Sequence, residues 1–253
     1  MKKPIIAMSG LKDGNMSFQY NSQRTGSIFE TRKNRSCFLD GLGIPENKVF
    51  YMDPRHSTRI RQVGNGHLKI RSEYTDIMGI TCDGLYTTQK NIALAFTPAD
   101  CMPIFFWNKK VIALVHAGRK GMAEALPLKM LFMLQEKGLV DAKNPLKIQM
   151  GHHIRTCCYK FPVKHFWEWG YKFTNMAPQG GDIFTVSLYW RLKYILANHH
   201  ILGGGAAMCT CCAKDKKRNF KFFSHTRSNN DRFPGNHPEG RNMAIIMARE
   251  EDN

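Results

Sequence analysis

Cys101 and His116 are the two side chains whose spacing points most directly to chemistry. Two apolar runs, 104–107 and 111–115, lie between them and are separated by the polar turn 108–110. Short apolar runs split by a polar turn favour a hairpin over a helix. Because an antiparallel hairpin brings its outer ends to the same end of a sheet, we expect the thiol and the imidazole to be neighbours. Such a pair could bind a metal or act as a nucleophile and its base.

The bend that follows His116 adds a second chemical possibility. The small residues of Ala117-Gly-Arg-Lys-Gly121 predict a turn into a helix, whose free backbone N–H groups could meet an anion. A cysteine beside a strand is, however, more often a small buried hydrophobe than a ligand. Spacing alone therefore leaves a reactive site and a packed core both open.

The composition is that of a folded protein. The chain has 253 residues, of which 43% are hydrophobic, enough for a full core. No apolar run approaches the ~20 residues of a membrane span. Residues 1–8 include too short an apolar segment for a secretory signal. We therefore expect a cytoplasmic protein with no membrane partner.

The net charge of +17, from 37 Lys and Arg against 20 Asp and Glu, predicts attraction to anions. The basic residues are spread along the chain, and the densest run, 214–218, is short. No aromatic-plus-basic motif or zinc finger accompanies them. The charge indicates general affinity for anions and no specific nucleic-acid partner.

Five of the eight cysteines fall in two clusters, Cys157-Cys158 and Cys209-Thr-Cys211-Cys212. A reducing cytosol disfavours a disulfide framework. Neither cluster supplies the two Cys-x-x-Cys pairs of a zinc ribbon. We therefore expect most of these thiols to be buried or idle.

Strands and helices are expected to alternate along the chain. Apolar runs predict strands at 3–8, 48–52, 82–88, 92–96, 147–151 and 243–247, and helical spacing predicts helices at 25–42, 121–137, 162–171 and 187–198. Pro127 should end or kink the first turn of its helix, and Ser187 can cap the last one. The sequence has no internal repeat or low-complexity linker, so one α/β domain over 1–253 is the simplest organisation.

Several motifs together give the chain a family resemblance. Their order is Asp83-Gly-Leu-Tyr-Thr, Ala99-Asp-Cys-Met-Pro, Val115-His-Ala-Gly118 and Phe222-Phe-Ser-His-Thr-Arg227, followed by Gly240-Arg-Asn-Met-Ala. In this combination and order the chain resembles the YfiH-like family of laccase-domain or "polyphenol oxidase" proteins, also described as purine nucleoside phosphorylases. The resemblance implies a single α/β domain of layered mixed β-sheets flanked by helices.

The resemblance also implies a mononuclear zinc site made by His56, Cys101 and His116, which would be the catalytic residues as well. His56 is the least certain match, because the family pattern Gln-Val-His reads Pro54-Arg-His56 here. His67, His152 and His153 compete for the same role. Copper could occupy the site in place of zinc.

The activity implied by the resemblance is phosphorolysis of adenosine, inosine and methylthioadenosine, together with hydrolytic deamination of adenosine. Zinc suits the hydrolysis, because it lowers the pKa of a bound water to about 7. The partners would be purine nucleosides and phosphate, bound by a monomer or small homo-oligomer. Candidates for substrate contacts are Arg59, Asp83, Lys120, Arg227 and Arg241, with Lys12 and Arg119 as further basic residues. Asp83 and Asp100 could instead orient ligands, move protons or only hydrogen-bond a turn.

Departures from the family pattern leave other functions open. Arg119 and Lys120 stand where the family has Trp and Arg, and an Arg-to-Lys change loses the bidentate fork for phosphate. The loop 151–158 has lost both prolines of the family pattern. The alternatives are a copper-dependent polyphenol oxidase, an amide or cell-wall peptide hydrolase, and a catalytically degenerate binding protein. A single His/Cys/His set lacks the many histidines that a multicopper laccase needs.

Overall fold

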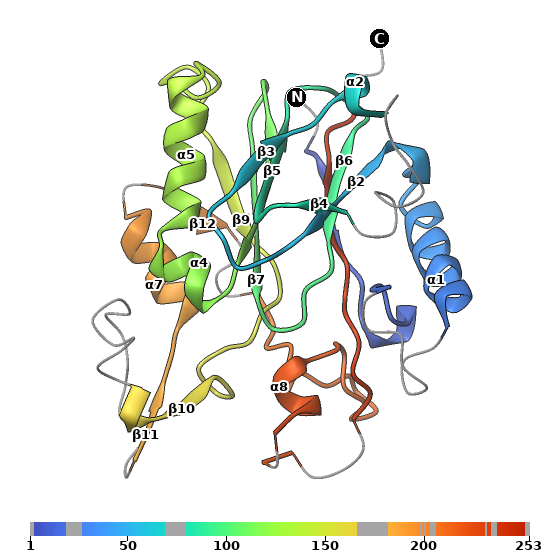
Figure 1. Cartoon of the computed structure of the whole chain (residues 1–253), viewed down its shortest axis with the longest axis vertical. Coiled ribbons are helices and arrows are strands. Elements are labelled where there is room, and N and C mark those ends of the chain that lie inside the picture. The colour runs from blue at the N-terminus through green and yellow to red at the C-terminus, as the bar shows by residue number, and fades with distance from the viewer. Residues whose placement is uncertain are drawn as a thin grey trace.

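Two β-sheets packed face to face, with helices on both outer sides, form the body of the protein (Figure 1). The structure is a computed structural model. It describes residues 3–18, 27–68, 79–165, 182–197, 199, 201–202, 206–230, 232–233 and 237–250. The layered mixed sheets flanked by helices confirm the fold class expected from the sequence.

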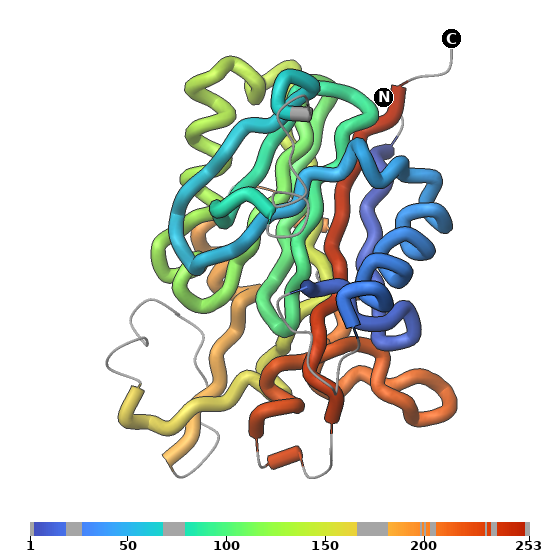
Figure 2. Tube along the Cα trace, turned by 45° about the vertical axis from the view of Figure 1, so that its right-hand side comes forward, coloured from blue at the N-terminus to red at the C-terminus, as the bar shows by residue number. Residues whose placement is uncertain are grey.

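The first sheet has five strands, in the order β1 (Ile5–Met8), β13 (Ala244–Met247), β6 (Ala93–Phe96), β2 (Val49–Asp53) and β4 (Ile80–Thr81). β13 is antiparallel to both its neighbours, whereas β2 is parallel to β6 and β4. Figure 2 shows the last strand, in red, running alongside the first, in blue. The first and last strands therefore pair within one sheet.

The second sheet has six strands, in the order β12 (Ile201–Leu202), β9 (Lys147–Met150), β7 (Met102–Trp107), β8 (Ile112–Ala117), β5 (Gly84–Thr87) and β3 (Ile60–Gln62). β7 and β8 form the expected antiparallel hairpin at its centre. A separate two-stranded sheet pairs β10 (Lys160–Pro162) with β11 (Ile183–Thr185). The central hairpin is buried on both faces, which explains its continuous apolar runs.

Alternating side chains of the two large sheets build separate cores. Phe96 and Ile246 from the first sheet meet Phe105 and Leu114 from the second between the sheets. On the outer side of the first sheet, α1 (Ile28–Asp40) packs through Leu39. On the outer side of the second sheet lie α4 (Arg119–Ala123), α5 (Leu126–Glu136) and α7 (Leu188–Ile195).

The short elements complete the chain. They are the 3-10 turns η1 (Leu11–Asp13), η2 (Glu46–Lys48) and η3 (Val163–His165), and the helices α2 (Asn65–Leu68) and α8 (His225–Ser228). No helix in the described part of the chain is long and apolar enough to cross a membrane.

Two of the helix predictions were wrong in detail. The helix expected at 121–137 is two helices, because Ala125 adopts φ 53° between α4 and α5. Pro127 is the second residue of α5, where its missing N–H removes no helical hydrogen bond. The helix expected at 162–171 is a strand end followed by the turn η3, and residues 166–171 lie outside the described residues.

The two other helices were predicted well. Ser187 caps α7 as expected, accepting a hydrogen bond from the N–H of Trp190 at 3.2 Å. α1 begins with a reciprocal capping box between Ser27 and Glu30. Residues 25 and 26 of the expected helix are outside the described residues.

Candidate active site

The hairpin brings Cys101 and His116 together, as the sequence predicted. Pro103 pairs with His116 and Met102 with Ala117, so Cys101 comes opposite Gly118 at the end of the sheet. A Cβ atom added to Gly118 would lie 2.7 Å from the Cys101 sulfur. Glycine is therefore required at this position to let the thiol approach the backbone of the neighbouring strand.

Asp100 fixes the turn that carries Cys101. It adopts φ 83°, a left-handed conformation that aspartate tolerates better than most residues. Its carboxylate accepts hydrogen bonds at 2.7 Å from the Thr210 hydroxyl and from the N–H of Thr226. Its carbonyl accepts one from the N–H of Ile154 at 2.9 Å. Segments distant in sequence thus hold Cys101 in place.

His56 enters the site from the loop that follows β2. Its φ of 56° is strained for a non-glycine residue. The Asp83 carboxylate holds this loop by accepting the backbone N–H groups of Arg55, His56 and Ser57 at 3.2, 3.0 and 2.7 Å. The Ser57 hydroxyl donates to the same carboxylate at 2.6 Å.

The same carboxylate orients His116. Nδ1 of His116 lies 2.8 Å from Oδ1 of Asp83, whose side chain is fully buried. Burial would raise the pKa of Asp83, but the hydrogen bonds from His116 and Ser57 outweigh it and hold that pKa well below its usual range. An ionised carboxylate accepts a hydrogen bond from Nδ1–H, which leaves Nε2 of His116 as the ring nitrogen available to the site.

Cys101 and His116 shift each other's pKa values. Burial would raise the pKa of Cys101, but His116 and then His56 lower it to about 6. Burial would lower the pKa of His116, but the charge of Cys101 and the hydrogen bond to Asp83 raise it to about 9. The site therefore stabilises a thiolate near neutral pH, which is the form of cysteine that binds metals or attacks as a nucleophile.

Three of these side chains are close enough to share one metal ion. The ligand atoms of His56, Cys101 and His116 lie within 4.8 Å of one another, and the two imidazole rings are 5.0 Å apart. Two nitrogens and one sulfur, with a carboxylate behind one histidine, are a donor set suited to a catalytic metal that keeps a coordination position open. The residues present fit the metal centre that the resemblance implies.

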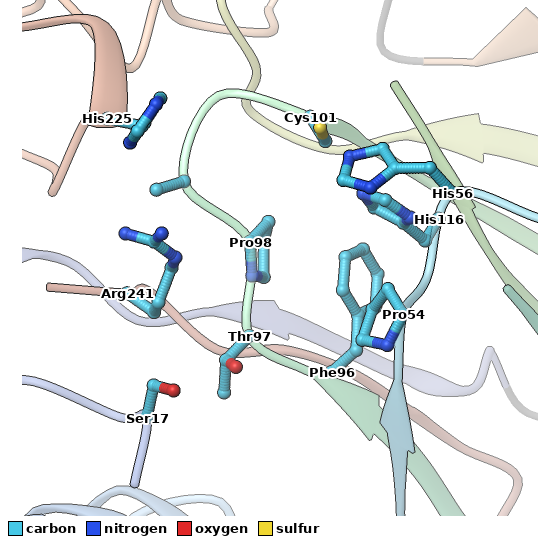
Figure 3. A pocket seen from close by; sticks show the side chains of 11 residues that line it. Ser17, Pro54, His56, Phe96, Thr97, Pro98, Cys101, His116, His225 and Arg241 are labelled. Atoms are coloured by element: carbon cyan, nitrogen blue, oxygen red, sulfur yellow. The ribbon is translucent and has the colours of Figure 1, made fainter. Parts of the chain in front are cut away.

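The three side chains form one wall of a cavity of about 290 Å³ (Figure 3). Arg241 and His225 lie on the facing side, with Pro98 between the two groups. The remaining lining is Ser17, Pro54, Phe96, Thr97 and Ala99. The Arg241 guanidinium donates to the carbonyl of Gly240 at 2.9 Å. The cavity thus places Arg241 and His225 opposite the three potential metal ligands. Oε1 of Glu239 lies 3.8 Å from Nη1 of Arg241 and 3.3 Å from Nδ1 of His225.

The remaining predicted site residues do not line this cavity. Asp83 is fully buried behind His116. Arg227 is buried as well, and its guanidinium donates to the carbonyls of Thr210, Cys211 and Phe222. Arg59 and Lys120 are exposed on the surface. Of the predicted substrate contacts, the structure brings Arg241 alone into the cavity lining.

The three competing histidines also lie apart from the group. His153 is buried, with Nδ1 2.9 Å from the carbonyl of Gly151, and Nδ1 of His152 accepts the N–H of Met208. His67 lies on α2, an exposed helix turn. Among these candidates His56 is therefore the one that joins Cys101 and His116.

Two residues of the site were missed at the sequence level. His225 was part of the Phe-Phe-Ser-His-Thr-Arg motif, but nothing in the motif singled it out. Ser57 follows His56 directly, and its hydrogen bond to Asp83 spans 26 residues. A side chain that acts through such a distant partner leaves no local spacing signal.

The layered fold and the His/Cys/His group describe an α/β protein with a potential metal site, and comparison with known proteins identifies the family. The chain belongs to the family described as multi-copper polyphenol oxidoreductase laccase, which it matches over residues 12–249. It is 33% identical over 181 residues to a purine nucleoside phosphorylase of Borreliella burgdorferi, covering 68% of this chain and 74% of that protein. The family expected from the motifs is therefore confirmed.

Further relatives cover more of the chain. The purine nucleoside phosphorylase YlmD of Geobacillus stearothermophilus is 26% identical over 256 residues, covering 94% of this chain and 84% of that protein. The crystal structure of YlmD from the same organism matches with a TM-score of 0.78 and 22% identity, over 98% of this chain and 93% of that one. The YfiH structure of Bacillus licheniformis matches with a TM-score of 0.74 and 22% identity, over 93% and 85%.

Proposed function

We propose that the chain is a metal-dependent purine nucleoside phosphorylase that also deaminates adenosine, with adenosine, inosine and methylthioadenosine as substrates. The observation that carries the proposal is the single cavity that combines the His56, Cys101 and His116 wall with Arg241 on the facing side. Its volume of about 290 Å³ is close to the lower end of small-molecule sites. The relatives named purine nucleoside phosphorylase support the phosphorolysis part of this proposal.

Phosphorolysis requires an anion site beside the sugar. A phosphate oxygen bonds to C1′ of the ribose while the C1′–N9 bond breaks, and the base leaves with the bonding electrons and takes up a proton. Arg241 offers a planar guanidinium suited to phosphate, and His225 lies beside it. Phe96, Pro98 and Pro54 give the cavity an apolar surface for a purine ring.

We propose zinc as the metal, held by His56, Cys101 and His116. When bound, zinc would supply Lewis acidity and a lowered pKa for a coordinated water, as deamination needs. The protein itself fixes the positions of the ligands. Asp83 accepts a hydrogen bond from Nδ1–H of His116 and another from the backbone N–H of His56. Copper also suits a site of nitrogen and sulfur ligands.

Polyphenol oxidation is the second candidate, favoured by the family's description. A multicopper oxidase needs several copper ions bound largely by histidine. In the described ranges, His56, Cys101 and His116 are the one potential metal group that contains histidine. This observation favours the purine reaction over the oxidase.

The test is product analysis of purified protein of known metal content, given adenosine with and without phosphate. Adenine and ribose 1-phosphate that require phosphate would establish phosphorolysis, and inosine formed without phosphate would establish deamination. Cys101→Ser should abolish both, whereas Cys37→Ser, on the exposed side of α1, should not. If metal-loaded protein forms neither product, the proposal is overturned in favour of an amide hydrolase or a binding protein.

A further inference from the structure

A second cluster of potential ligands lies outside the cavity. It consists of cysteines from two segments, one after β9 and one before α8. The sulfur atoms of Cys157, Cys158, Cys209 and Cys212 all lie within 4.8 Å of one another. From the sequence we expected most of these thiols to be buried or idle. However, Cys209 and Cys212 are themselves a Cys-x-x-Cys pair, and folding adds the adjacent pair Cys157-Cys158.

The spacing of the sulfurs matches a single ion. Zinc binds thiolates at about 2.3 Å in tetrahedral geometry, which places the sulfurs roughly 3.8 Å apart. The Cys157 and Cys212 sulfurs are already 3.5 Å apart, and the largest separation in the group does not exceed 4.8 Å. Small side-chain rotations would therefore complete a tetrahedron around one ion.

Backbone hydrogen bonds align the two segments. His153 and Cys209 form a parallel β-bridge, and the N–H of Thr210 donates to the carbonyl of His153 at 3.1 Å. The N–H of Arg155 points at the Cys209 sulfur from 3.4 Å. Backbone hydrogen bonds therefore hold the two segments side by side and bring the four sulfurs together, which favours a preformed ligand set.

A buried cation lies next to the cluster. Arg227 is 1% exposed, and its guanidinium donates to the carbonyls of Thr210 and Cys211. Within the described part of the chain, no carboxylate lies at ion-pair distance from it. Burying a charge is costly. Asp100 is a carboxylate whose charge acts on Arg227 from beyond ion-pair distance, and a zinc ion with four thiolates, of net charge −2, would add to that stabilisation.

We propose that Cys157, Cys158, Cys209 and Cys212 bind a structural zinc ion. The four sulfurs would fill its coordination shell, so the ion would have no open position for substrate. Its role would be to stabilise the fold. Both cysteine segments hydrogen-bond to Asp100, through the N–H of Ile154 and the hydroxyl of Thr210. The zinc ion would therefore link the two segments that hold Asp100, the residue before Cys101.

The test measures metal in the full-length chain with the first site disabled. The Cys101→Ala protein, loaded with zinc and dialysed against a weak chelator, should keep about one zinc per chain. Adding Cys212→Ser or Cys157→Ser should weaken zinc binding by at least tenfold, as measured by competition with a chromogenic chelator. Both positions are exposed, and Cys37→Ser is the matched control for loss of an exposed thiol.

Cobalt gives a readout that does not depend on substituting the four clustered cysteines. Co²⁺ bound to the Cys101→Ala protein should show the intense thiolate-to-metal absorption and visible bands of a tetrahedral sulfur site. The proposal is overturned by a chain that retains no zinc while all its thiols react with a thiol reagent. A Cys157–Cys212 disulfide in the freshly isolated protein, or iron with inorganic sulfide in place of zinc, would overturn it as well.

Discussion

Nδ1 of His116 lies 2.8 Å from Oδ1 of Asp83, and the same buried carboxylate accepts the backbone N–H of His56 at 3.0 Å. One side chain therefore orients two of the three potential metal ligands. It does so in different ways, by fixing the tautomer of one histidine and the backbone of the other. The Ser57 hydroxyl completes the shell of donors around it.

Replacing Asp83 with asparagine should weaken metal binding without unfolding the protein. A neutral amide cannot stabilise the proton on Nδ1 of His116 as a carboxylate does, and loss of such a partner lowers metal affinity by roughly 10–100-fold. Competition with a chelator measures the change. Asp141→Asn, which alters an exposed aspartate paired with Lys110, is the control. Equal affinity in Asp83→Asn and wild-type protein would contradict the role of Asp83.

Gly118→Ala should disable the site through one methyl group. The added Cβ would lie 2.7 Å from the Cys101 sulfur and 3.6 Å from Cδ2 of His56, so the thiol must move. We expect metal content and turnover to fall at least tenfold, while the circular dichroism spectrum remains unchanged. Gly66→Ala is the control, because nothing lies within 4 Å of its added Cβ. A Gly118→Ala protein with full metal content would contradict the prediction, because it would show that the end of β8 can shift to make room for the added methyl group.

The hairpin could be predicted from the sequence because its signals are local. Apolar runs and a polar turn define β7 and β8, and the antiparallel register then places Cys101 near His116. Arg227 could not be placed in the same way. Its motif suggested a substrate contact, yet its guanidinium is held by carbonyls 16 and 17 residues away.

The cysteine cluster and the break between α4 and α5 show the same limit. Cys157 and Cys212 meet across 55 residues of sequence, through segments aligned by a β-bridge that no spacing reveals. The apolar spacing of 121–137 continues through Ala125, whose left-handed backbone splits the helix. The spacing of apolar residues indicates which residues share a buried face, but it does not indicate where the backbone changes direction.

Arg241→Gln should separate the two proposed reactions. The guanidinium lies across the cavity from the metal wall, so its loss should raise the KM for phosphate, whereas deamination of adenosine, which uses no phosphate, should continue. A charged hydrogen bond contributes about 1.5–3 kcal/mol, which corresponds to roughly 10–100-fold. Arg232→Gln, at an exposed arginine, is the control. An equal loss of both reactions would show that Arg241 does not act on phosphate.

His153, which is not among the residues that line the cavity, is a buried titratable group. Its side chain is buried, with Nδ1 2.9 Å from the carbonyl of Gly151. Burial lowers its pKa to about 4, although the hydrogen bond to Gly151 opposes the shift. The native protein therefore keeps this imidazole neutral at pH values where the unfolded chain already protonates it.

This difference predicts a loss of stability in acid that His153→Asn should reduce. Between the unfolded pKa of about 6.5 and the native value of about 4, the unfolded chain binds more protons, so stability falls as the pH falls. The full effect is about 3 kcal/mol below pH 4. Urea unfolding at several pH values should show a shallower dependence in His153→Asn than in wild type, and no change in His67→Asn, at an exposed histidine. Acid also releases bound metal from both proteins, so the difference between them is the measure. Parallel pH profiles for wild type and His153→Asn would contradict the prediction.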